Sequence, residues 1–441
     1  MQNNFILNFK MKRLFITILL FPIFLLGQNR EKMIIVSYFS FIPQLSVYVE
    51  AKSNDNIDCV LISVDSTDNF NSIKAKIDNI YKNFNADFLL LVGDNEHIPA
   101  YKIEEGLSDI HYAFENENNP SPRMSVGRFS VETHQDLQTM IDRSLIRKHF
   151  SKHAVGIASY HKSELTGKRD YEQVQFMGQQ LQYKGFTSVS ELFSNNPTYQ
   201  DVITALQSGA TWLNYAGNGS YDGWNTTGFD IQHIDNLPDN IELPIILSAS
   251  CLGGHFANRT CFAEKWLRST KNGNPIGAVA AIMSSNLTDW DATLSAMLVI
   301  NENMPSTNSN CRLGNLYLQG YRYIIDSMQR PTDAQCWLLF GDPSLWVYPP
   351  NENTVFEKEI PVYQLIIYPN PTDGQLRIKN YELRESEKRK SEIEIYDIIG
   401  KLQEFRISKI EKSEIEIDIS HLANGMYFLK IDGKVMKIIK E

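Results

Sequence analysis

The order of residue types predicts thiol chemistry at one point of the chain. The apolar run 244–247 leads into Ser-Ala-Ser-Cys-Leu-Gly-Gly-His (248–255), so Cys251 falls on a glycine-rich bend that we expect between a buried strand and a helix. A cysteine nucleophile is commonly activated by an adjacent base such as histidine. The loop expected beside it follows the apolar run 211–216 and reads Gly-Asn-Gly-Ser (217–220), so asparagine stands where a base is needed. The sequence therefore indicates a cysteine site that lacks the most obvious base.

Composition places the chain among folded globular proteins and excludes several partners. Its 441 residues are enough for about two or three domains with full cores. The net charge of −10 and the scattered Lys and Arg residues argue against binding to polyanions, so we expect no nucleic-acid partner. The odd number of cysteines argues against a disulfide scaffold, and none has the spacing of a metal site. These five cysteines are Cys59, Cys251, Cys261, Cys311 and Cys336.

The N-terminus has the pattern of a signal peptide over residues 1–27. Met11-Lys12-Arg13 supplies the positive start, 14–26 the apolar core, and Gly27-Gln28 the cleavage region. We therefore expect export through the periplasm, followed by secretion or attachment to the cell surface. The apolar core is short for a membrane span, with an uncleaved anchor as the alternative, and no later segment has the length to cross a bilayer. After signal cleavage the chain should not be an integral membrane protein.

Short apolar runs alternate with amphipathic segments from residue 32 to about residue 350, which predicts mostly parallel sheets covered by helices. We expect two α/β units, over 32–150 and 151–350. The predicted helices include one that begins after Thr133 and ends at about residue 149, one over 170–183, one capped by Thr198 that ends at Gly209, and one over about 260–271. The carboxyl ends of neighbouring parallel strands meet at one edge, where ligands bind. The residues that follow four predicted strands of the second unit should therefore share one site, and they include His161, Asn218, Cys251 and Trp290.

Beyond Pro349-Pro350 the pattern changes to short strands of alternating polarity separated by turn signals. We interpret 351–360 as a linker. Residues 361–441 are then an antiparallel β domain, most simply a small β-sandwich.

Most of 32–348 resembles the gingipain family of cysteine endopeptidases, peptidase family C25. The resemblance implies a caspase-like α/β fold with two parallel-sheet subdomains, and a protein or peptide substrate. It rests on six motifs in the family's order, each weak alone. They are Leu-Val-Gly-Asp-Asn-Glu-His-Ile-Pro-Ala (91–100), Val-Gly-Arg-Phe-Ser (126–130), Asn-Tyr-Ala-Gly-Asn-Gly-Ser (214–220), Ala-Ser-Cys (249–251), Cys-Phe-Ala-Glu (261–264) and Phe-Gly-Asp-Pro-Ser-Leu (340–345).

The resemblance assigns roles at the cysteine site. It makes Cys251 the nucleophile and puts Asn218 at the position of the family's general-base histidine. Asparagine cannot accept a proton near neutral pH, so ordinary thiol activation is lost unless another group substitutes. One hypothesis is a relocated base, with His161 taking the thiol proton and Asn218 orienting its ring; the alternative is a surface histidine at 161. His255 is a further candidate base.

Two residues resemble the family's arginine-selective pocket. Asp170 corresponds to the aspartate at its base, which would favour Arg or Lys at the P1 position of a substrate through a charge-assisted pair. The alternative is an aspartate that complements the dipole of the helix it begins. Trp290 corresponds to the tryptophan that lines that pocket, and its alternative is ordinary packing.

The resemblance requires no cofactor for catalysis, but calcium is a feature of the family. Asp94, Glu96, His97 and Asp109 are candidate ligands in an oxygen-rich loop, with turn chemistry as the alternative. No strict calcium motif is present, so the sequence leaves any metal ligands unassigned.

The C-terminal module resembles the type A sorting domain of the bacterial type IX secretion system, which implies that secretion machinery as a partner. The resemblance rests on Tyr-Pro-Asn-Pro-Thr-Asp-Gly (368–374), Asn-Gly-Met-Tyr-Phe-Leu-Lys (424–430) and the final Lys-Ile-Ile-Lys (437–440).

Two hypotheses of function follow. The first is a secreted cysteine endopeptidase that uses Cys251, prefers Arg or Lys at P1, and has reduced activity because of Asn218. The second is a catalytically silent homologue that binds peptides or surface partners through the same cleft.

Overall fold

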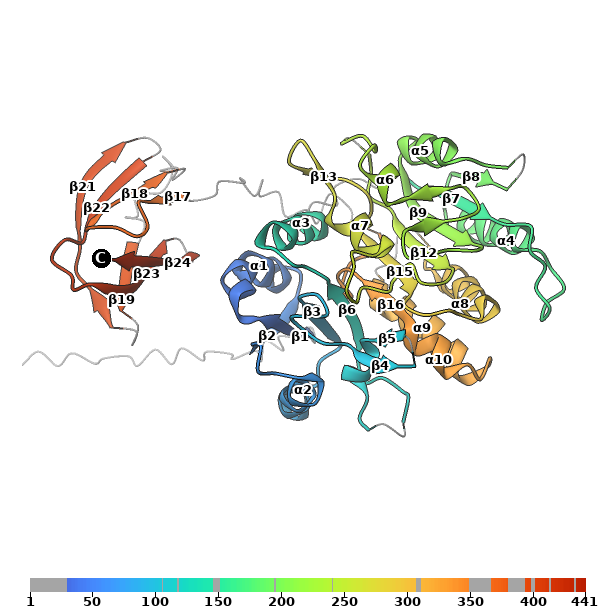
Figure 1. The fold of residues 1–441 in the computed structure, drawn as a ribbon, viewed down its shortest axis with the longest axis horizontal. Coiled ribbons are helices and arrows are strands. Elements are labelled where there is room, and N and C mark those ends of the chain that lie inside the picture. The colour runs from blue at the N-terminus through green and yellow to red at the C-terminus, as the bar shows by residue number, and fades with distance from the viewer. Residues whose placement is uncertain are drawn as a thin grey trace, which may run out of the picture. The chain divides into compact units, whose positions relative to one another are not determined.

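The computed structural model contains two folded regions (Figure 1). The predicted signal peptide 1–27 and the predicted linker 351–360 lie outside the described residues. The described residues are 30–104, 106–116, 119–145, 151–193, 196–239, 241–306, 311–348, 366–379, 393–397, 401–411, 414–431 and 434–441.

The larger region is built on one ten-stranded sheet (Figure 1). Across the sheet the strands are β2 (Ile57–Val64), β1 (Glu31–Tyr38), β3 (Phe88–Val92), β6 (Ser125–Phe129), β16 (Trp337–Phe340), β15 (Ala280–Ser284), β12 (Ile245–Ala249), β9 (Ala210–Ala216), β7 (His153–Ala158) and β8 (Ser188–Leu192).

The sheet consists of two parallel halves that run in opposite directions. From β2 to β16 every neighbouring pair is parallel, and so is every pair from β15 to β8. The two halves meet at β15 and β16, which pair antiparallel from Ala281 opposite Phe340 to Ser284 opposite Trp337. The predicted α/β fold with two parallel-sheet subdomains is therefore confirmed, and the structure adds that their sheets are continuous.

Helices cover both faces of this sheet, so its strands are buried on both sides. In β1, Ile34 and Val36 belong to one hydrophobic cluster, whereas Met33 and Ile35 belong to the other. Such alternation between two apolar faces gives a continuous apolar run in the sequence. The first face is covered by α2 (Phe70–Phe84), α4 (Asp170–Tyr183), α8 (Trp290–Asn303) and α9 (Leu313–Asp326). The second is covered by α1 (Ser46–Asn54), α3 (His134–Leu145), α5 (Tyr199–Gln207) and α7 (Phe262–Arg268).

Shorter elements connect these layers. They are η1 (Phe39–Leu45), the hairpin β4 (Tyr101–Ile103) and β5 (Gly106–Ser108), η2 (Ile110–Ala113), the pair β10 (Gly223–Trp224) and β11 (Phe229–Asp230), α6 (Ile231–Ile234), the pair β13 (Thr270–Lys271) and β14 (Asn274–Pro275), and α10 (Pro331–Cys336).

Element boundaries agree in part with the sequence-based expectation. The helix predicted over 260–271 is α7, which ends at Arg268 because Ser269 is extended and leads into the β13–β14 hairpin. The helix α4 has the predicted bounds, and Asp201 Oδ2 accepts hydrogen bonds from the Thr198 main chain and hydroxyl at the start of α5, as a capping pattern predicts. Residues 146–150, where α3 was expected to end, lie outside the described part.

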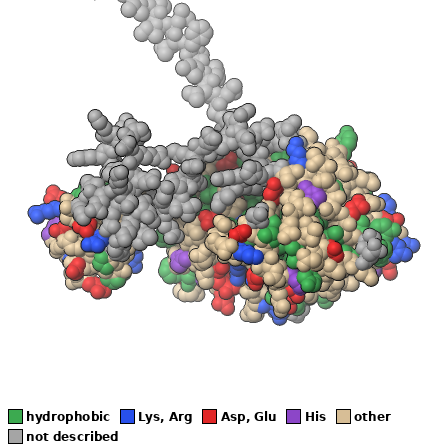
Figure 2. Space-filling view, turned by 90° about the horizontal axis from the view of Figure 1, so that it is seen from above, with side chains coloured by type: hydrophobic (Ala, Val, Ile, Leu, Met, Phe, Trp, Pro, Cys, Tyr) green, Lys and Arg blue, Asp and Glu red, His purple; other side chains and the backbone are tan. Residues whose placement is uncertain are grey.

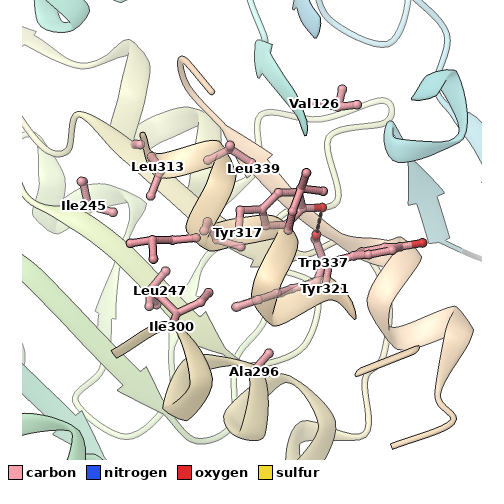
Figure 3. Close-up of a cluster of buried hydrophobic side chains, with 14 of the residues drawn as sticks. Val126, Ile245, Leu247, Ala296, Ile300, Leu313, Tyr317, Tyr321, Trp337 and Leu339 are labelled. Carbon is pink, nitrogen blue, oxygen red and sulfur yellow. Dashed lines mark hydrogen bonds between the residues drawn. The ribbon is translucent and has the colours of Figure 1, made fainter. Parts of the chain in front are cut away.

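The core beneath α8 and α9 joins the two halves of the sheet (Figure 3). Ile245 and Leu247 of β12 and Leu339 of β16 lie in one cluster with residues of both helices. At its polar edge the buried Tyr317 hydroxyl donates a hydrogen bond of 2.7 Å to the Trp337 carbonyl oxygen. Burying each large apolar side chain contributes roughly 1.5–3 kcal/mol, so this cluster fixes the seam between the halves.

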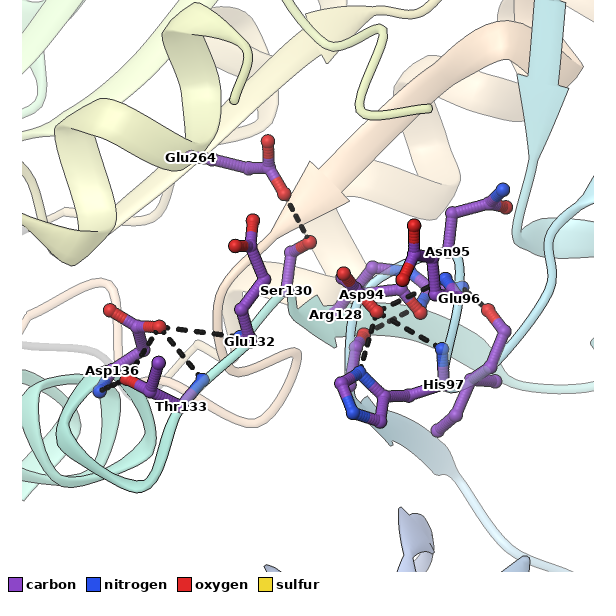
Figure 4. Close-up of polar contacts among 12 residues, drawn as sticks. Asp94, Asn95, Glu96, His97, Arg128, Ser130, Glu132, Thr133, Asp136 and Glu264 are labelled. Atoms are coloured by element: carbon purple, nitrogen blue, oxygen red, sulfur yellow. Dashed lines mark hydrogen bonds and ion pairs between the residues drawn. The ribbon is translucent and has the colours of Figure 1, made fainter. Parts of the chain in front are cut away.

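A buried arginine organises the loops of the first half (Figure 4). Arg128 on β6 has no exposed surface, and its guanidinium donates to both carboxylate oxygens of Asp109 at 2.7 and 2.6 Å. It also donates to the carbonyl oxygens of Gly93 at 2.7 Å and Ile98 at 3.1 Å. The ring of Phe256, whose centroid lies 4.7 Å from the guanidinium carbon, covers it from the second half of the sheet. Arg128 therefore ties the loop after β3 to the segment that follows Cys251.

A second arginine joins the two ends of the described larger region. Arg312 contacts Glu31 and Asp55 at 2.7 and 2.6 Å, and Trp346 stacks on it at 3.4 Å. The Trp346 indole N–H also donates to Asp55 at 2.8 Å. The start of β1 and the segment after β16 are therefore held by one side chain.

The C-terminal region is a β-sandwich of two antiparallel sheets, as predicted. Its core combines Leu376, Ile378 and Ile417 of the first sheet with Ile395 and Leu429 of the second. The first sheet contains β17 (Ile366–Tyr368), β18 (Gln375–Lys379), β22 (Glu414–Asp418) and β21 (Arg406–Glu411). The second contains β20 (Leu402–Gln403), β19 (Ile393–Asp397), β23 (Gly425–Ile431) and β24 (Lys434–Lys440).

Within the described residues, no helix combines the length and apolar character needed to span a membrane. On the face that Figure 2 shows, outside the grey atoms, basic and acidic side chains are interspersed. That visible area therefore presents no continuous cationic surface for a polyanion.

Replacing Arg128 by methionine should lower the free energy of unfolding by about 3–5 kcal/mol, because Asp109 would keep a buried charge without its partner. All six tryptophans (Trp212, Trp224, Trp266, Trp290, Trp337 and Trp346) belong to the larger region, so urea unfolding followed by tryptophan fluorescence reports on it selectively. The matched control is Arg322→Met, which removes an exposed arginine of α9. Equal effects of the two substitutions would contradict a stabilising role for the Arg128–Asp109 pair.

Candidate active site

The loops predicted to share a site lie at one edge of the sheet. The strands β15, β12, β9 and β7 are consecutive neighbours and are parallel, so their carboxyl ends meet. Two glycines let these loops approach closely. A Cβ at Gly219 would lie 2.8 Å from Ser250 Cβ and 3.2 Å from the Cys251 carbonyl oxygen, and a Cβ at Gly217 would lie 3.2 Å from Ser159 Cβ. The loops after β7, β9 and β12 are therefore in contact.

Cys251 lies on a bend that is hydrogen-bonded to the end of β15. Leu252 has a φ of 65°, its N–H donates to the Asn286 carbonyl oxygen at 3.1 Å, and the Gly254 N–H donates to that of Ser284 at 2.8 Å. A Cβ at Gly254 would lie 2.7 Å from the Met283 oxygen, which explains the glycine. The half-buried thiol accepts a hydrogen bond from the Thr288 N–H at 3.5 Å. The bend thus holds the sulfur against the chain that precedes α8.

Asn218 is exposed on the neighbouring loop, which its main chain holds in place. Its carbonyl oxygen accepts hydrogen bonds from the Tyr215 hydroxyl at 2.6 Å and the Asn225 N–H at 3.0 Å. Its carboxamide makes no hydrogen bond to the described residues and borders a cavity of about 240 Å³ together with Tyr160 and Thr226. The position therefore presents its side chain to solvent without using it in the fold.

The structure places neither candidate histidine in a hydrogen bond with the thiol. Among the described residues, Cys251 Sγ has hydrogen-bonding contacts with the main chain of Thr288 alone. His161 is exposed, and its main-chain N–H donates a hydrogen bond to Ser159 Oγ at 3.1 Å. His255 Nδ1 lies 2.8 Å from the Ser285 carbonyl oxygen, to which it donates. A relocated base at His161 or His255 accordingly stays a prediction.

The two candidate specificity residues begin helices at this same edge. Asp170 is the first residue of α4 and has no exposed surface, and its Oδ2 accepts a hydrogen bond of 2.5 Å from the Ser159 hydroxyl. Trp290 is the first residue of α8, which packs beside α4, but its side chain lies outside the described part. The buried carboxylate of Asp170 therefore lies behind Ser159, which borders the same cavity as Asn218.

The sequence profile of peptidase family C25 matches residues 27–348, which is more than half of the chain. The chain belongs to peptidase family C25. The profile of the secretion system C-terminal sorting domain matches residues 366–441.

Individual relatives are gingipains of Porphyromonas gingivalis. The chain is 30% identical to gingipain R2 over 279 residues, which is 59% of this chain and 37% of that protein. It is also 30% identical to gingipain R1 over 279 residues, 28% of that protein. The match thus spans 37% of the length of gingipain R2 and 28% of the length of gingipain R1.

Solved structures show the same fold. A crystal structure of the Arg-specific cysteine proteinase gingipain R (RgpB) matches with a TM-score of 0.69 and 22% identity, over 94% of this chain and 99% of that one. A complex of Porphyromonas gingivalis RgpB pro- and mature domains matches with a TM-score of 0.67 and 22% identity, over 93% of this chain and 100% of that one. At this level of identity the similarity shows the fold alone.

In this C25 chain, the structure reveals a carboxylate that supports the segment beside Cys251 and that the sequence did not indicate. Asp333 of α10 accepts hydrogen bonds from the Thr288 hydroxyl and from the Asp289 N–H, both at 3.0 Å, and burial raises its pKa. Arg330 lies 3.0 Å from Asp289 on the same segment. In the sequence, Asp333 is only an acidic residue in the first turn of a helix. Nothing in the sequence distinguishes a residue that supports the Thr288 segment from one that complements the helix dipole.

The residues predicted to bind calcium do not fit a calcium site as they stand. Both carboxylate oxygens of Asp109 are taken by Arg128. Asp94 Oδ1 lies 2.6 Å from His97 Nδ1 and accepts main-chain hydrogen bonds from Glu96 and His97 at 3.0 Å (Figure 4). Within the described ranges, no three His, Cys, Asp or Glu side chains are grouped to hold a metal ion.

Asp333→Ala should slow alkylation of Cys251 by iodoacetamide about fivefold, because the Thr288 segment that donates to the sulfur loses hydrogen bonds worth ~1 kcal/mol each. Mass spectrometry of the Cys251 peptide measures the rate apart from the other thiols. Asp333→Asn is the matched control: its amide oxygen can accept both hydrogen bonds, so the rate should be retained. If Asp333→Asn were as slow as Asp333→Ala, the positioning role would be wrong.

Proposed function

We propose that this chain is an exported, gingipain-like cysteine endopeptidase that binds polypeptides at the carboxyl edge of β7, β9, β12 and β15 and cleaves them slowly through Cys251. One observation carries the proposal. The thiol and its supporting bend are in place, whereas the adjoining loop offers the carboxamide of Asn218.

The chemistry explains why turnover should be slow. Attack of Cys251 on a peptide carbonyl carbon forms a thioester and releases the amine, so the thiol proton must leave and the amine must gain one. A histidine performs both transfers, and general acid–base catalysis contributes typically about 10²–10⁴-fold in rate. The Asn218 carboxamide can orient a group by hydrogen bonding but cannot exchange a proton at neutral pH. The site therefore keeps its nucleophile and lacks the group that activates it.

A catalytically silent peptide-binding protein is the second candidate function. It is favoured by the absence, among the described residues, of a hydrogen bond between Cys251 and any histidine. In that case the same edge of the sheet would bind a peptide and release it uncleaved.

Asn218→His should raise kcat/KM for peptide hydrolysis about 10²–10⁴-fold, because position 218 is exposed on the loop that contacts the Cys251 bend through Gly219, and histidine supplies the missing base. The assay is hydrolysis of a fluorogenic peptide by the exported protein at pH 7.5. The matched control is Asn225→His, which places an imidazole on another exposed position at the border of the same cavity.

Cys251→Ala in the Asn218→His background should abolish the gain. A relocated base would be supported instead if wild-type turnover were lost on substitution of His161 or His255 and Asn218→His gave no gain. That result would contradict the proposal of slow catalysis without a base. Saturable peptide binding with no turnover in either form would favour the silent protein.

We further propose a preference for Arg or Lys at P1, with Asp170 as its source. The support is the place of its buried carboxylate at the start of α4, hydrogen-bonded to Ser159, which borders the cavity beside Asn218. A basic side chain that displaced the Ser159 hydroxyl would gain a charge-assisted hydrogen bond in a largely dry setting.

Asp170→Asn should reduce the preference for arginine over norleucine at P1 about tenfold, or ~1.4 kcal/mol, because the amide keeps the hydrogen bond to Ser159 and loses the charge. The measurement is the rate of mass addition at Cys251 by peptide chloromethylketones that differ in the P1 residue. The comparison within one variant cancels general effects on thiol reactivity. An unchanged ratio would contradict a role for Asp170 in specificity.

Export follows from the C-terminal region. A secretion system sorting domain at 366–441 supports secretion or display at the cell surface. We propose the type IX system as the machinery, with passage through the periplasm after removal of residues 1–27. Protein or peptide substrates would then be encountered outside the cell.

A further inference from the structure

A second cavity lies on the helical layer that covers the first face of the sheet. It has a volume of about 340 Å³ and is bordered by α4, by α8 and by the end of α9. Its α8 residues are Ser295, Leu298, Val299 and Glu302, whose spacing puts them on one side of the helix. We refer to the surface between α4 and this side of α8 as the α4–α8 groove.

The floor and walls of the groove are largely apolar. Leu298 and Val299 of α8 are half-buried along the floor. Phe176 of α4 is 49% exposed and Tyr323 of α9 is 36% exposed, and both border the cavity. Leu165, at the end nearer the active site, is 62% exposed. Large apolar side chains gathered around a cavity are typical of a binding surface rather than of ordinary solvent exposure.

Two glutamines of α4 add an independent sign of a ligand. Gln173 and Gln180 both border the groove, and Gln173 is only 3% exposed. Gln173 Nε2 and Gln180 Oε1 are buried and have no hydrogen-bond partner among the described residues. A buried polar atom without a partner is costly, so a ligand that pairs with these amides would gain more than a contact at the surface.

The two amides suit the main chain of a polypeptide. They are seven residues apart on α4, which corresponds to about 10.5 Å along the helix at 1.5 Å per residue. About three residues of extended chain cover the same distance at 3.3 Å each. A peptide carbonyl oxygen can accept from one glutamine and a peptide N–H can donate to the other. An apolar side chain between them would then lie over Leu298 and Val299.

Charges at the two ends define an orientation. Lys168, just before α4, borders the groove at the end nearer the active site, and Glu302 borders it near the carboxyl end of α8. The groove is complementary to a chain with an acidic side chain at the first end and a basic one at the second. Because α4 and α8 begin with Asp170 and Trp290 at the active-site edge, one polypeptide can occupy the groove and reach that edge.

We propose that the α4–α8 groove is an exosite for an extended, apolar segment of a polypeptide substrate. The choice of a substrate as occupant rests on the proposed function. The groove itself would bind the polypeptide whether or not Cys251 cleaves it.

The test uses the full chain with Cys251→Ala, to prevent cleavage, and fluorescein-labelled β-casein as an unfolded polypeptide probe. Phe176→Asp should raise the dissociation constant at least tenfold, measured by fluorescence anisotropy. Tyr183→Asp is the matched control, because Tyr183 is also an apolar residue of α4, is 90% exposed and lies outside the groove. Leu165→Asp is a second groove variant on a connecting segment, where a substitution leaves α4 intact.

Outcomes separate the groove from the active site. Weaker casein binding in both groove variants, with normal binding by Tyr183→Asp, supports the exosite. Equal binding by all variants overturns it, even if a short peptide chloromethylketone still labels Cys251 in the wild-type chain. Conversely, if the chloromethylketone fails to label Cys251 but the groove variants still weaken casein binding, the proposed function is contradicted and the exosite is supported. If sedimentation shows that Phe176→Asp breaks a dimer and casein binding is unchanged, the groove is an interface between copies and the proposal is wrong.

Discussion

The antiparallel pairing of β15 with β16 is the constraint on which the rest of the structure depends. Because it reverses strand direction in the middle of the sheet, the carboxyl ends of the two halves point to opposite edges. The loops with Cys251 and Asn218 therefore come from the second half alone, and the Asp94–His97 loop lies at the other edge. The first half contributes supporting contacts, which include the stacking of Phe256 on Arg128 and the hydrogen bonds between Leu107 and Ser285.

Different atoms determine the shape of the site and its chemical reactivity. Close approach at Gly219 and Gly254 and main-chain hydrogen bonds to Leu252 and Asn218 set the shape of the loops. None of these contacts uses the side chain at 218, so a change of that side chain leaves the scaffold as it is. The shape of these loops and the identity of the side chain at position 218 can therefore vary independently, because different atoms determine them.

Much of this arrangement could be predicted from the sequence. The continuous apolar runs of β9 and β12 and the glycines beside them placed Cys251 and Asn218 at adjoining strand ends. Local patterns did not reveal β16, since its four residues follow α10 directly and pair with a strand more than fifty positions earlier. Nor did they reveal Asp333, whose hydrogen bonds to Thr288 and Asp289 depend on how α10 packs. Pairings between distant segments carry no periodic signal.

The contacts of Arg312 have a mechanical consequence. The strand-like pairing of Arg312 with Trp346, and the ion pairs from Arg312 to Glu31 and Asp55, join the last described segment of the larger region to its first strand. A pulling force applied through the chain beyond Tyr348 would load this cluster before it reached β16 at the centre of the sheet. The antiparallel pairing of β15 with β16 would therefore bear such a force only after the contacts of Arg312 had broken.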